Sequence, residues 1–520
     1  MRTRRRHAVR TDSALQFLLM RGVAGCFLAT FFTSGLGCRS AAQTGPAPTV
    51  EVLTNPDQSL AARRRALAQL SIQASHTSGL SPAARAAVAE IVWAPRQPRS
   101  LREAAAELWL QHEPDRFWHA AARQLPGLGS AGWRQWVIRE AVRQDRREMQ
   151  AALARAWWAN LSPRHIPTAI VETEEAVALV ALSGHADLTA ALVELVRGSA
   201  DPATFAAAWS LLSHVAGTAA MHREALRWRD GAGVDLAAAS DLAEESVLPD
   251  AITEGLRRCL GEASGVLGRL PQTPEGLRRL SGLVRDVNAW PNVKARSASL
   301  PPGVAASLEL RHLGMLQWAD RSHLLAEIAW QETGGTSDVS PAPSLIASAV
   351  GRDPAYRRGL PAAVTLESLD PADRALLRLI CTWLGDRSIA VELFTQLDRD
   401  VADPRGEHGG LLEWDDAGRP TAAAFASQDR VGHNRRYVSS VAMMDRLARG
   451  LAHYHFHATS YDAAAFAGPG RGDLDFATTN ETASLVLTPL GRDRLNADLV
   501  LPGDRWLDLG QINRPTGSRR

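Results

Sequence analysis

The chain contains little cysteine, which excludes two kinds of structure. Four cysteines among 520 residues do not make a disulfide framework. Cys-x-x-Cys pairs are absent, so a structural zinc site of that kind is excluded as well. Only Cys259 and Cys381 follow the N-terminal segment that holds the other two. They form either one bridge or two buried thiols, and buried thiols are the commoner arrangement.

Several signatures of enzymes and nucleic-acid-binding proteins are missing too. The sequence has no His-Glu-x-x-His helix, no Gly-x-Ser-x-Gly elbow and no P-loop. Its formal net charge is only +2, so composition gives no reason to expect a nucleic-acid partner. Lys294 is the single lysine, and the bias to arginine and alanine is typical of GC-rich coding sequences. Runs of arginine are therefore no evidence of function here.

The N-terminus has the composition of a bacterial export signal. Arginines continue to Arg21, and residues 22–37 are then uncharged, apolar or small, a stretch too short to span a bilayer comfortably. Gly35-Leu36-Gly37-Cys38 resembles a lipoprotein cleavage box, although Gly35 stands where leucine is usual. Residues 1–38 therefore predict export to the periplasm or envelope. Either Cys38 is lipidated, which would be the only membrane contact, or ordinary cleavage occurs elsewhere.

A long region after this segment has the pattern of short amphipathic helices. Apolar residues recur every three or four positions in runs of about ten residues, and turn signals separate the runs. No such helix buries its apolar face alone, so neighbours must stack, as an α-solenoid or as a compact bundle. Residues 101–106 resemble the start of a HEAT-like helix, but no fixed period follows. The expected helices are 60–72, 82–93, 101–110, 117–125, 133–142, 149–158, 174–182, 188–196, 203–215, 372–384 and 389–401.

Composition also predicts where the parts of the chain begin and end. The expected fold is a mostly α-helical array followed by a small α/β domain. We expect a signal at 1–38, a Pro/Thr-rich tether at 39–58, the helical region at 59–330, a Gly/Ser/Pro-rich linker at 331–346, a helical connector at 347–388, the α/β domain at 389–510 and a tail at 511–520.

The C-terminal domain holds a candidate metal site. Alternation predicts a strand over 453–457, and residues two apart in a strand point to the same side. His455 and His457 would then present two imidazoles to one point. Catalytic zinc takes three protein ligands and a water, and Asp473, which opens an apparent helix, is the candidate third ligand. Glu407, just before a predicted strand at 409–414, is the candidate general base.

These segments resemble the JAMM (MPN-plus) zinc metalloproteases. Glu407-His408-Gly409-Gly410-Leu411-Leu412 is similar to the family's Glu-x-Gly-Gly-x-Leu, His455-Phe456-His457 to its His-x-His, and Gly470-Arg471-Gly472-Asp473 to its Ser-x-x-Asp. The order of predicted helices and strands also matches. The resemblance implies Zn²⁺ on His455, His457 and Asp473, water activation by Glu407, and cleavage of peptide or isopeptide bonds in a protein or peptide substrate.

The sequence departs from that family in three places. Gly470 replaces a serine that supports the developing oxyanion, Ala458 replaces a proline, and the interval from His457 to Asp473 is longer by about five residues. An inserted loop would absorb the longer interval. Together these departures indicate a divergent branch or a module with altered chemistry.

Two further histidines and two functions stay open. His453 is either an outer partner of the ligands or a plain surface residue. His433 either lines the site or belongs to a loop. The first function is an exported zinc-dependent peptidase or isopeptidase with a helical scaffold for substrate or partner. The second is a non-catalytic scaffold lipoprotein whose C-terminal module only binds metal or a partner. Gly470 favours the second, whereas Glu407 favours the first, because a structural site needs no base.

Overall fold

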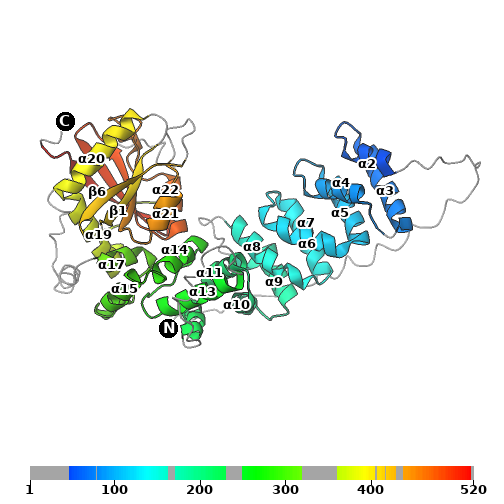
Figure 1. Ribbon diagram of the computed structural model, residues 1–520, viewed down its shortest axis with the longest axis horizontal. Helices are drawn as coiled ribbons and strands as arrows, with labels where there is room; N and C mark the ends of the chain where they lie inside the picture. Colours follow the sequence, from blue (N-terminus) through cyan, green and yellow to red (C-terminus); the bar gives the residue numbers. More distant parts are fainter. Residues whose placement is uncertain are drawn as a thin grey trace, which may run out of the picture. The chain divides into compact units, whose positions relative to one another are not determined.

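The computed structural model describes residues 46–77, 79–161, 170–229, 249–318, 360–403, 407–415, 417–428 and 437–516 (Figure 1). The predicted signal with Cys38, the predicted linker 331–346 and His433 lie outside these residues. The chain forms two compact units, Met1–Ile91 and Val92–Arg520.

The first unit contains a helix where the sequence predicted a tether. Helix α2 (Pro46–Thr54) packs on α3 (Leu60–Thr77), and α4 (Pro82–Trp93) ends at the border of the unit. Leu53 of α2 is fully buried, and the buried Arg63 donates from Nε to the Leu53 carbonyl at 2.8 Å. This bond satisfies one of the carbonyls that a helix leaves open at its C-terminus. The second half of the expected tether is therefore packed structure.

The second unit begins with the helical array that the sequence predicted. Contacts run mainly between helices that follow one another along the chain, and each helix expected in this part corresponds to one observed. Tryptophans fill the core, with Trp118, Trp133, Trp157 and Trp209 almost fully buried. The helices are α5 (Arg99–His112), α6 (Pro114–Gln124), α7 (Ala131–Arg143), α8 (Gln150–Asn160), α9 (Glu174–Ser183), α10 (Leu188–Gly198), α11 (Pro202–Arg229), α13 (Pro249–Ala263), α14 (Pro274–Val284), α15 (Ala289–Ser297), α16 (Pro302–Ala305) and α17 (Leu313–Trp318).

Two sequence-level questions, the state of the cysteines and the presence of a membrane-spanning helix, are addressed by the described residues. Cys259 in α13 and Cys381 are free and buried, which confirms two thiols rather than a bridge. Among the described residues, no single helix is long and apolar enough to cross a membrane, and one bent pair, α9 with α10, passes that test on length and composition.

The C-terminal part is an α/β domain built on a six-stranded mixed sheet (Figure 1). The strand order is β2-β1-β3-β4-β5-β6, and β3 and β4 are the parallel pair. Helix α22 forms the crossover between these two strands, as parallel neighbours require. The strands are β1 (Gly409–Trp414), β2 (Pro420–Phe425), β3 (Ala452–Phe456), β4 (Ser484–Pro489), β5 (Arg494–Leu501) and β6 (Arg505–Asn513), and the helices are α19 (Pro371–Leu384), α20 (Arg387–Ala402), α21 (Val441–Arg446) and α22 (Arg471–Asn480).

The domain is larger than the predicted 389–510. Strand β6 continues into the expected tail, and the N–H of Val364 donates to the carbonyl of Trp506 at 2.9 Å. A segment before α19 is thus tied to the last strand.

The two faces of the sheet are covered by different helices. On one face, Gln396 of α20 bonds Tyr454 of β3 and the carbonyl of Ala422 of β2. On the other face, Leu474 and Ala477 of α22 pack with β4 and β5. Because side chains alternate along a strand, the histidines of β3 lie on the α22 face.

The Gly409-Gly410 pair allows a close approach of three strands at the start of β1. A Cβ atom on Gly410 would lie 1.9 Å from the carbonyl oxygen of Ala423, and one on Gly409 would lie 2.6 Å from that of Tyr454. Both obstacles are backbone atoms, which cannot move without breaking the sheet. The glycines are therefore required for Glu407 to lie directly beside β3.

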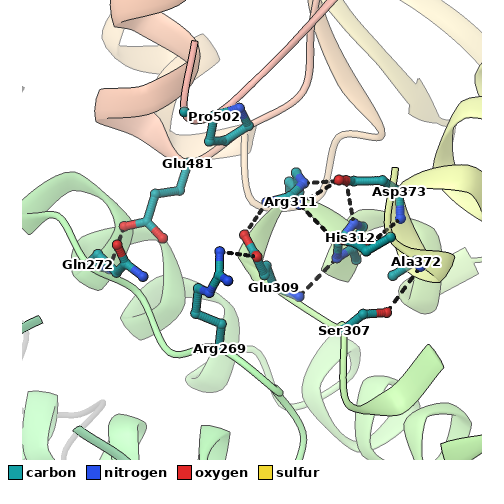
Figure 2. Close-up of polar contacts among 12 residues, drawn as sticks. Arg269, Gln272, Ser307, Glu309, Arg311, His312, Ala372, Asp373, Glu481 and Pro502 are labelled. Carbon is teal, nitrogen blue, oxygen red and sulfur yellow. Dashed lines mark hydrogen bonds and ion pairs between the residues drawn. The ribbon is translucent and has the colours of Figure 1, made fainter. Parts of the chain in front are cut away.

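Buried polar contacts join the helical array to the α/β domain (Figure 2). Arg311 and His312, which precede α17, bind Asp373 of α19. Arg279 of α14 donates to the carbonyls of Asn480, Glu481 and Leu447. Since the array and the α/β domain complete each other's hydrogen bonds, they form one structural unit.

Glu481 makes a further contact between these parts and gives a prediction for pH. Its Oε1 accepts from the N–H groups of Gln272 and Thr273, at 2.7 Å each, and from the Thr273 hydroxyl at 2.9 Å. Burial raises the pKa of Glu481 from 4.5 to about 7; these donors lower it, while Glu309 raises it further. Its folded pKa is the higher one, so its stabilisation is complete below pH 4.5 and is lost as pH rises through 7.

Replacing Glu481 with glutamine keeps an acceptor oxygen and removes the titration. Between pH 5 and pH 8, the wild-type chain should lose about 3 kcal/mol of unfolding free energy relative to this variant. Urea unfolding at several pH values measures the difference. If the difference in unfolding free energy between the two proteins did not change with pH, Glu481 would be ionised throughout this range. The three hydrogen-bond donors would then outweigh burial in setting its pKa.

Candidate metal centre

The structure brings together the three side chains that the sequence selected as ligands. His455 Nε2 lies 3.2 Å from His457 Nε2 and 3.1 Å from Asp473 Oδ1, and His457 Nε2 lies 3.4 Å from Asp473 Oδ2. Their ligand atoms all lie within 4.8 Å of one another. A residue of β3, the residue just after that strand and a residue of α22 thus converge on one point.

Local structure explains this convergence. Alternation along β3 turns His455 and His457 to the same face of the sheet. Asp473 lies in the first turn of α22, where a carboxylate is favoured by the helix dipole. Its Oδ2 accepts from the N–H of Gly470 at 2.6 Å, which fixes the carboxylate toward the histidines. Gly470 itself contributes only backbone to this site.

The distances suit a tetrahedral cation with this donor set. Zinc binds imidazole nitrogen and carboxylate oxygen at about 2.0–2.2 Å, so two ligand atoms on a tetrahedral zinc lie about 3.3–3.5 Å apart. Here the two imidazole nitrogens lie 3.2 Å apart, and each has a different oxygen of the Asp473 carboxylate at 3.1 or 3.4 Å. Two nitrogens and one carboxylate match the three protein ligands of catalytic zinc sites. The residues present therefore fit Zn²⁺.

The charges of these three groups also shift one another's pKa values. Burial raises the pKa of Asp473, but the two imidazoles outweigh it and hold that pKa well below its usual range. Burial lowers the pKa of His457, but Asp473 outweighs it and raises that pKa to about 9. A buried carboxylate that is ionised beside two imidazoles is a ready ligand for a divalent cation.

Glu407 belongs to the same cavity as the three ligands. The cavity has a volume of about 550 Å³ and is lined by Glu407, Tyr437, His453, His455, His457, Gly470, Gly472, Asp473, Asp475, Phe476, Thr479 and Asn480. Burial raises the pKa of Glu407, and the neighbouring histidines oppose this rise. A carboxyl group with a raised pKa next to a candidate metal site has the properties of a general base.

The structure places His453 in the interior, so a plain surface position is excluded. Its side chain is almost fully buried, its Nδ1 lies 2.8 Å from Ser484 Oγ, and its ring packs on Phe476 and His455. It lines the cavity beside the candidate ligands without a hydrogen bond to them among the described residues. Burial lowers the pKa of His453 well below its usual value, so the ring is neutral.

Asp400 is a residue of this region that sequence reasoning missed. It is fully buried in α20, and its Oδ1 accepts from the N–H of His408 at 2.6 Å. Burial raises the pKa of Asp400 to about 8, and Glu407 contributes to the rise. Asp400 thus fixes the backbone beside Glu407. No sequence signal identifies it, because an aspartate seven residues before a glutamate belongs to no recurring pattern.

A second group of His312, Asp370 and Asp373 also satisfies the distance criterion for a metal, but its ligand atoms are already used. Asp373 accepts from Arg311 through both oxygens, and also from His312 and Arg505. His312 Nδ1 accepts from the N–H of Glu309, which leaves the proton on Nε2. A protonated nitrogen and a carboxylate bound to two guanidinium groups make an ion-pair cluster and no cation site.

Comparisons of the chain with protein-family models, with curated proteins and with solved structures give no match. The chemistry of the centre therefore has to be argued from its geometry.

Proposed function

We propose that the C-terminal domain is a zinc-dependent hydrolase that cleaves peptide or isopeptide bonds, as in the JAMM-like metalloproteases that its sequence resembles. The observation that carries the proposal is the convergence of His455, His457 and Asp473, whose ligand atoms lie within 4.8 Å of one another, in one cavity with Glu407. The predicted export signal, with its lipoprotein-like box at Cys38, makes a periplasmic or envelope protein the proposed substrate.

The chain's own residues have separate tasks in this proposal. His455, His457 and Asp473 hold Zn²⁺, which would acidify a water molecule and polarise the scissile carbonyl. Glu407 accepts the proton that the attacking water loses and returns it to the leaving amine as the C–N bond breaks. Asp400 and the Gly409-Gly410 pair position the backbone of Glu407 beside β3.

The first test is the metal content of the full chain, since the helical array and the α/β domain share buried hydrogen bonds. Purified protein is supplied with zinc, freed of excess, and measured by mass spectrometry. We expect about one zinc per chain, lost in His455→Ala and in His457→Ala. His185→Ala is the matched control, because His185 is a partly exposed histidine that pairs with Glu194 in the array. Folded wild-type protein without zinc would refute the proposal.

One observation favours a second function, a module that binds metal or a partner without catalysis. Gly470 stands at the start of α22 and offers no hydroxyl to stabilise a developing oxyanion. A chain that binds one zinc and cleaves no peptide under any condition tested would support this alternative. Glu407 then would have no catalytic task, and Glu407→Gln would leave every measured property of the metal site unchanged.

A further inference from the structure

A groove of about 720 Å³ lies between the helical array and the α/β domain. Helices α13 and α14 form one side, and α21 with the segment before it forms the other. Large apolar side chains line both sides: Ile252, Leu256 and Leu277 on the array, and Val441 and Met444 on α21. Ile252 and Val441 are 38% and 64% exposed, although most large hydrophobic side chains in the described residues are buried. The groove therefore presents apolar surface to solvent.

The groove also carries excess positive charge. Arg278 and Arg285 are exposed residues of its lining, and their side chains form no ion pair or hydrogen bond within the described part of the chain. The lining includes Arg279 as well, and Asp445 is the one acidic residue among the described residues that form it. Arg278 and Arg285 are seven residues apart, which is about 10 Å along α14. Two free cations at that spacing favour a partner with regularly placed negative charges.

The chemistry of the lining discriminates between kinds of partner. A single-stranded nucleic acid binds on aromatic side chains along a run of cations, and the described lining of this groove contains no aromatic residue. An extended polypeptide rises about 3.3 Å per residue, so acidic residues three apart span the distance between the two arginines. Apolar residues between them would contact the exposed side chains of Ile252 and Val441. An acidic and apolar polypeptide is therefore the matching occupant.

The groove adjoins the metal cavity. Arg279 lines the groove and donates to the carbonyl of Asn480, which lines the cavity. Met444 lines the groove and packs on the same buried cluster as Tyr437 and Phe476, two lining residues of the cavity. The groove and the cavity thus share neighbouring residues. A polypeptide held in the groove would lie beside the candidate metal centre.

We propose that this groove binds an extended polypeptide segment with acidic residues three apart and apolar residues between them, and that it selects the substrate of the metal centre. The selection of a substrate rests on the proposed hydrolase function, whereas the binding itself does not. Arg278 and Arg285 recognise the acidic side chains, and the apolar walls formed by α13 and α21 bury the hydrophobic ones.

The test uses a fluorescein-labelled peptide of four Glu-Leu-Ser repeats and the full chain. Fluorescence anisotropy should show binding that weakens at high salt, and the Lys-Leu-Ser and Glu-Ser-Ser peptides should bind at least about tenfold more weakly. The double variant Arg278→Glu/Arg285→Glu should lose at least about tenfold in affinity. The matched control is Arg123→Glu/Arg223→Glu, which changes two exposed arginines away from the groove lining and should bind as the wild type does.

Equal affinity for the acidic and basic peptides, or an unchanged affinity in the Arg278/Arg285 variant, would overturn the proposal. The proposal would also be overturned if the wild-type chain did not bind the peptide but a variant with the acidic residues of 230–248 neutralised did. The chain's own segment would then be the occupant. Zinc content separates the two hypotheses. His455→Ala should bind peptide normally, and the Arg278/Arg285 variant should bind zinc normally. Peptide binding by a chain that takes up no zinc would refute the hydrolase and leave the groove standing.

Discussion

Replacing Asp373 with alanine is expected to lower the free energy of unfolding by about 3–5 kcal/mol, the usual cost of breaking a buried ion pair on one side. The carboxylate accepts from Arg311 Nε at 2.6 Å and Nη2 at 2.9 Å, from His312 Nε2 at 3.0 Å and from Arg505 Nη1 at 2.9 Å. Figure 2 shows Arg311 and His312 converging on it. Arg311 and His312 are buried as deeply as Asp373. Alanine would remove two hydrogen bonds from the buried Arg311 guanidinium and leave it with Glu309 and the more distant Asp370 as counter-ions.

The measurement is urea unfolding of the full chain at neutral pH, with Asp370→Ala as the comparison. Asp370 is partly exposed and caps α19, so its removal should cost only about 1 kcal/mol. Burial raises the pKa of Asp373, but His312 and Arg311 outweigh it and hold that pKa far below normal. Its contribution is therefore complete above about pH 4 and declines in stronger acid. Equal losses in both variants would contradict the cluster's role.

Replacing Glu407 with glutamine is expected to lower the rate of peptide cleavage by about 10²–10⁴-fold while zinc stays bound. Glutamine has the size of glutamate and still accepts the backbone N–H of Tyr437, but it takes no proton from water. Cleavage of fluorescein-labelled casein and zinc content are measured on the same preparations. The rate should fall at constant zinc content, because Glu407 is assigned to proton transfer rather than to the metal.

Glu413→Gln is the matched control for that experiment. Glu413 is also a buried glutamate, in β1, and it pairs with Arg446 away from the cavity lining. It should keep both cleavage and zinc. Wild-type cleavage rates in Glu407→Gln would remove Glu407 from the mechanism, and loss of zinc in that variant would make it a ligand instead.

The sequence by itself determined most of the local structure. Three- and four-residue spacing predicted the helices, and the period of two predicted that His455 and His457 share a face. These patterns are readable because they depend on residues close together in the chain. Glu407 and the Gly409-Gly410 pair are also close together in the chain, so this pattern is readable from the sequence as well. The glycines let β1 lie against its neighbours.

Only the tertiary structure decided which distant residues support the site. Arg279 bonds carbonyls about two hundred positions away, at Asn480 and Glu481, and the Asp373 cluster joins three separate segments. The sequence predicted which face of the strand His453 lies on, but it did not predict that α22 covers that face. Whether His453 lies at the surface or in the interior therefore stayed open. The groove on α14 and α21 also arises from packing between the array and the α/β domain. Side chains that meet across such separations leave no period in the sequence, so burial and partnership appear only when the chain is folded.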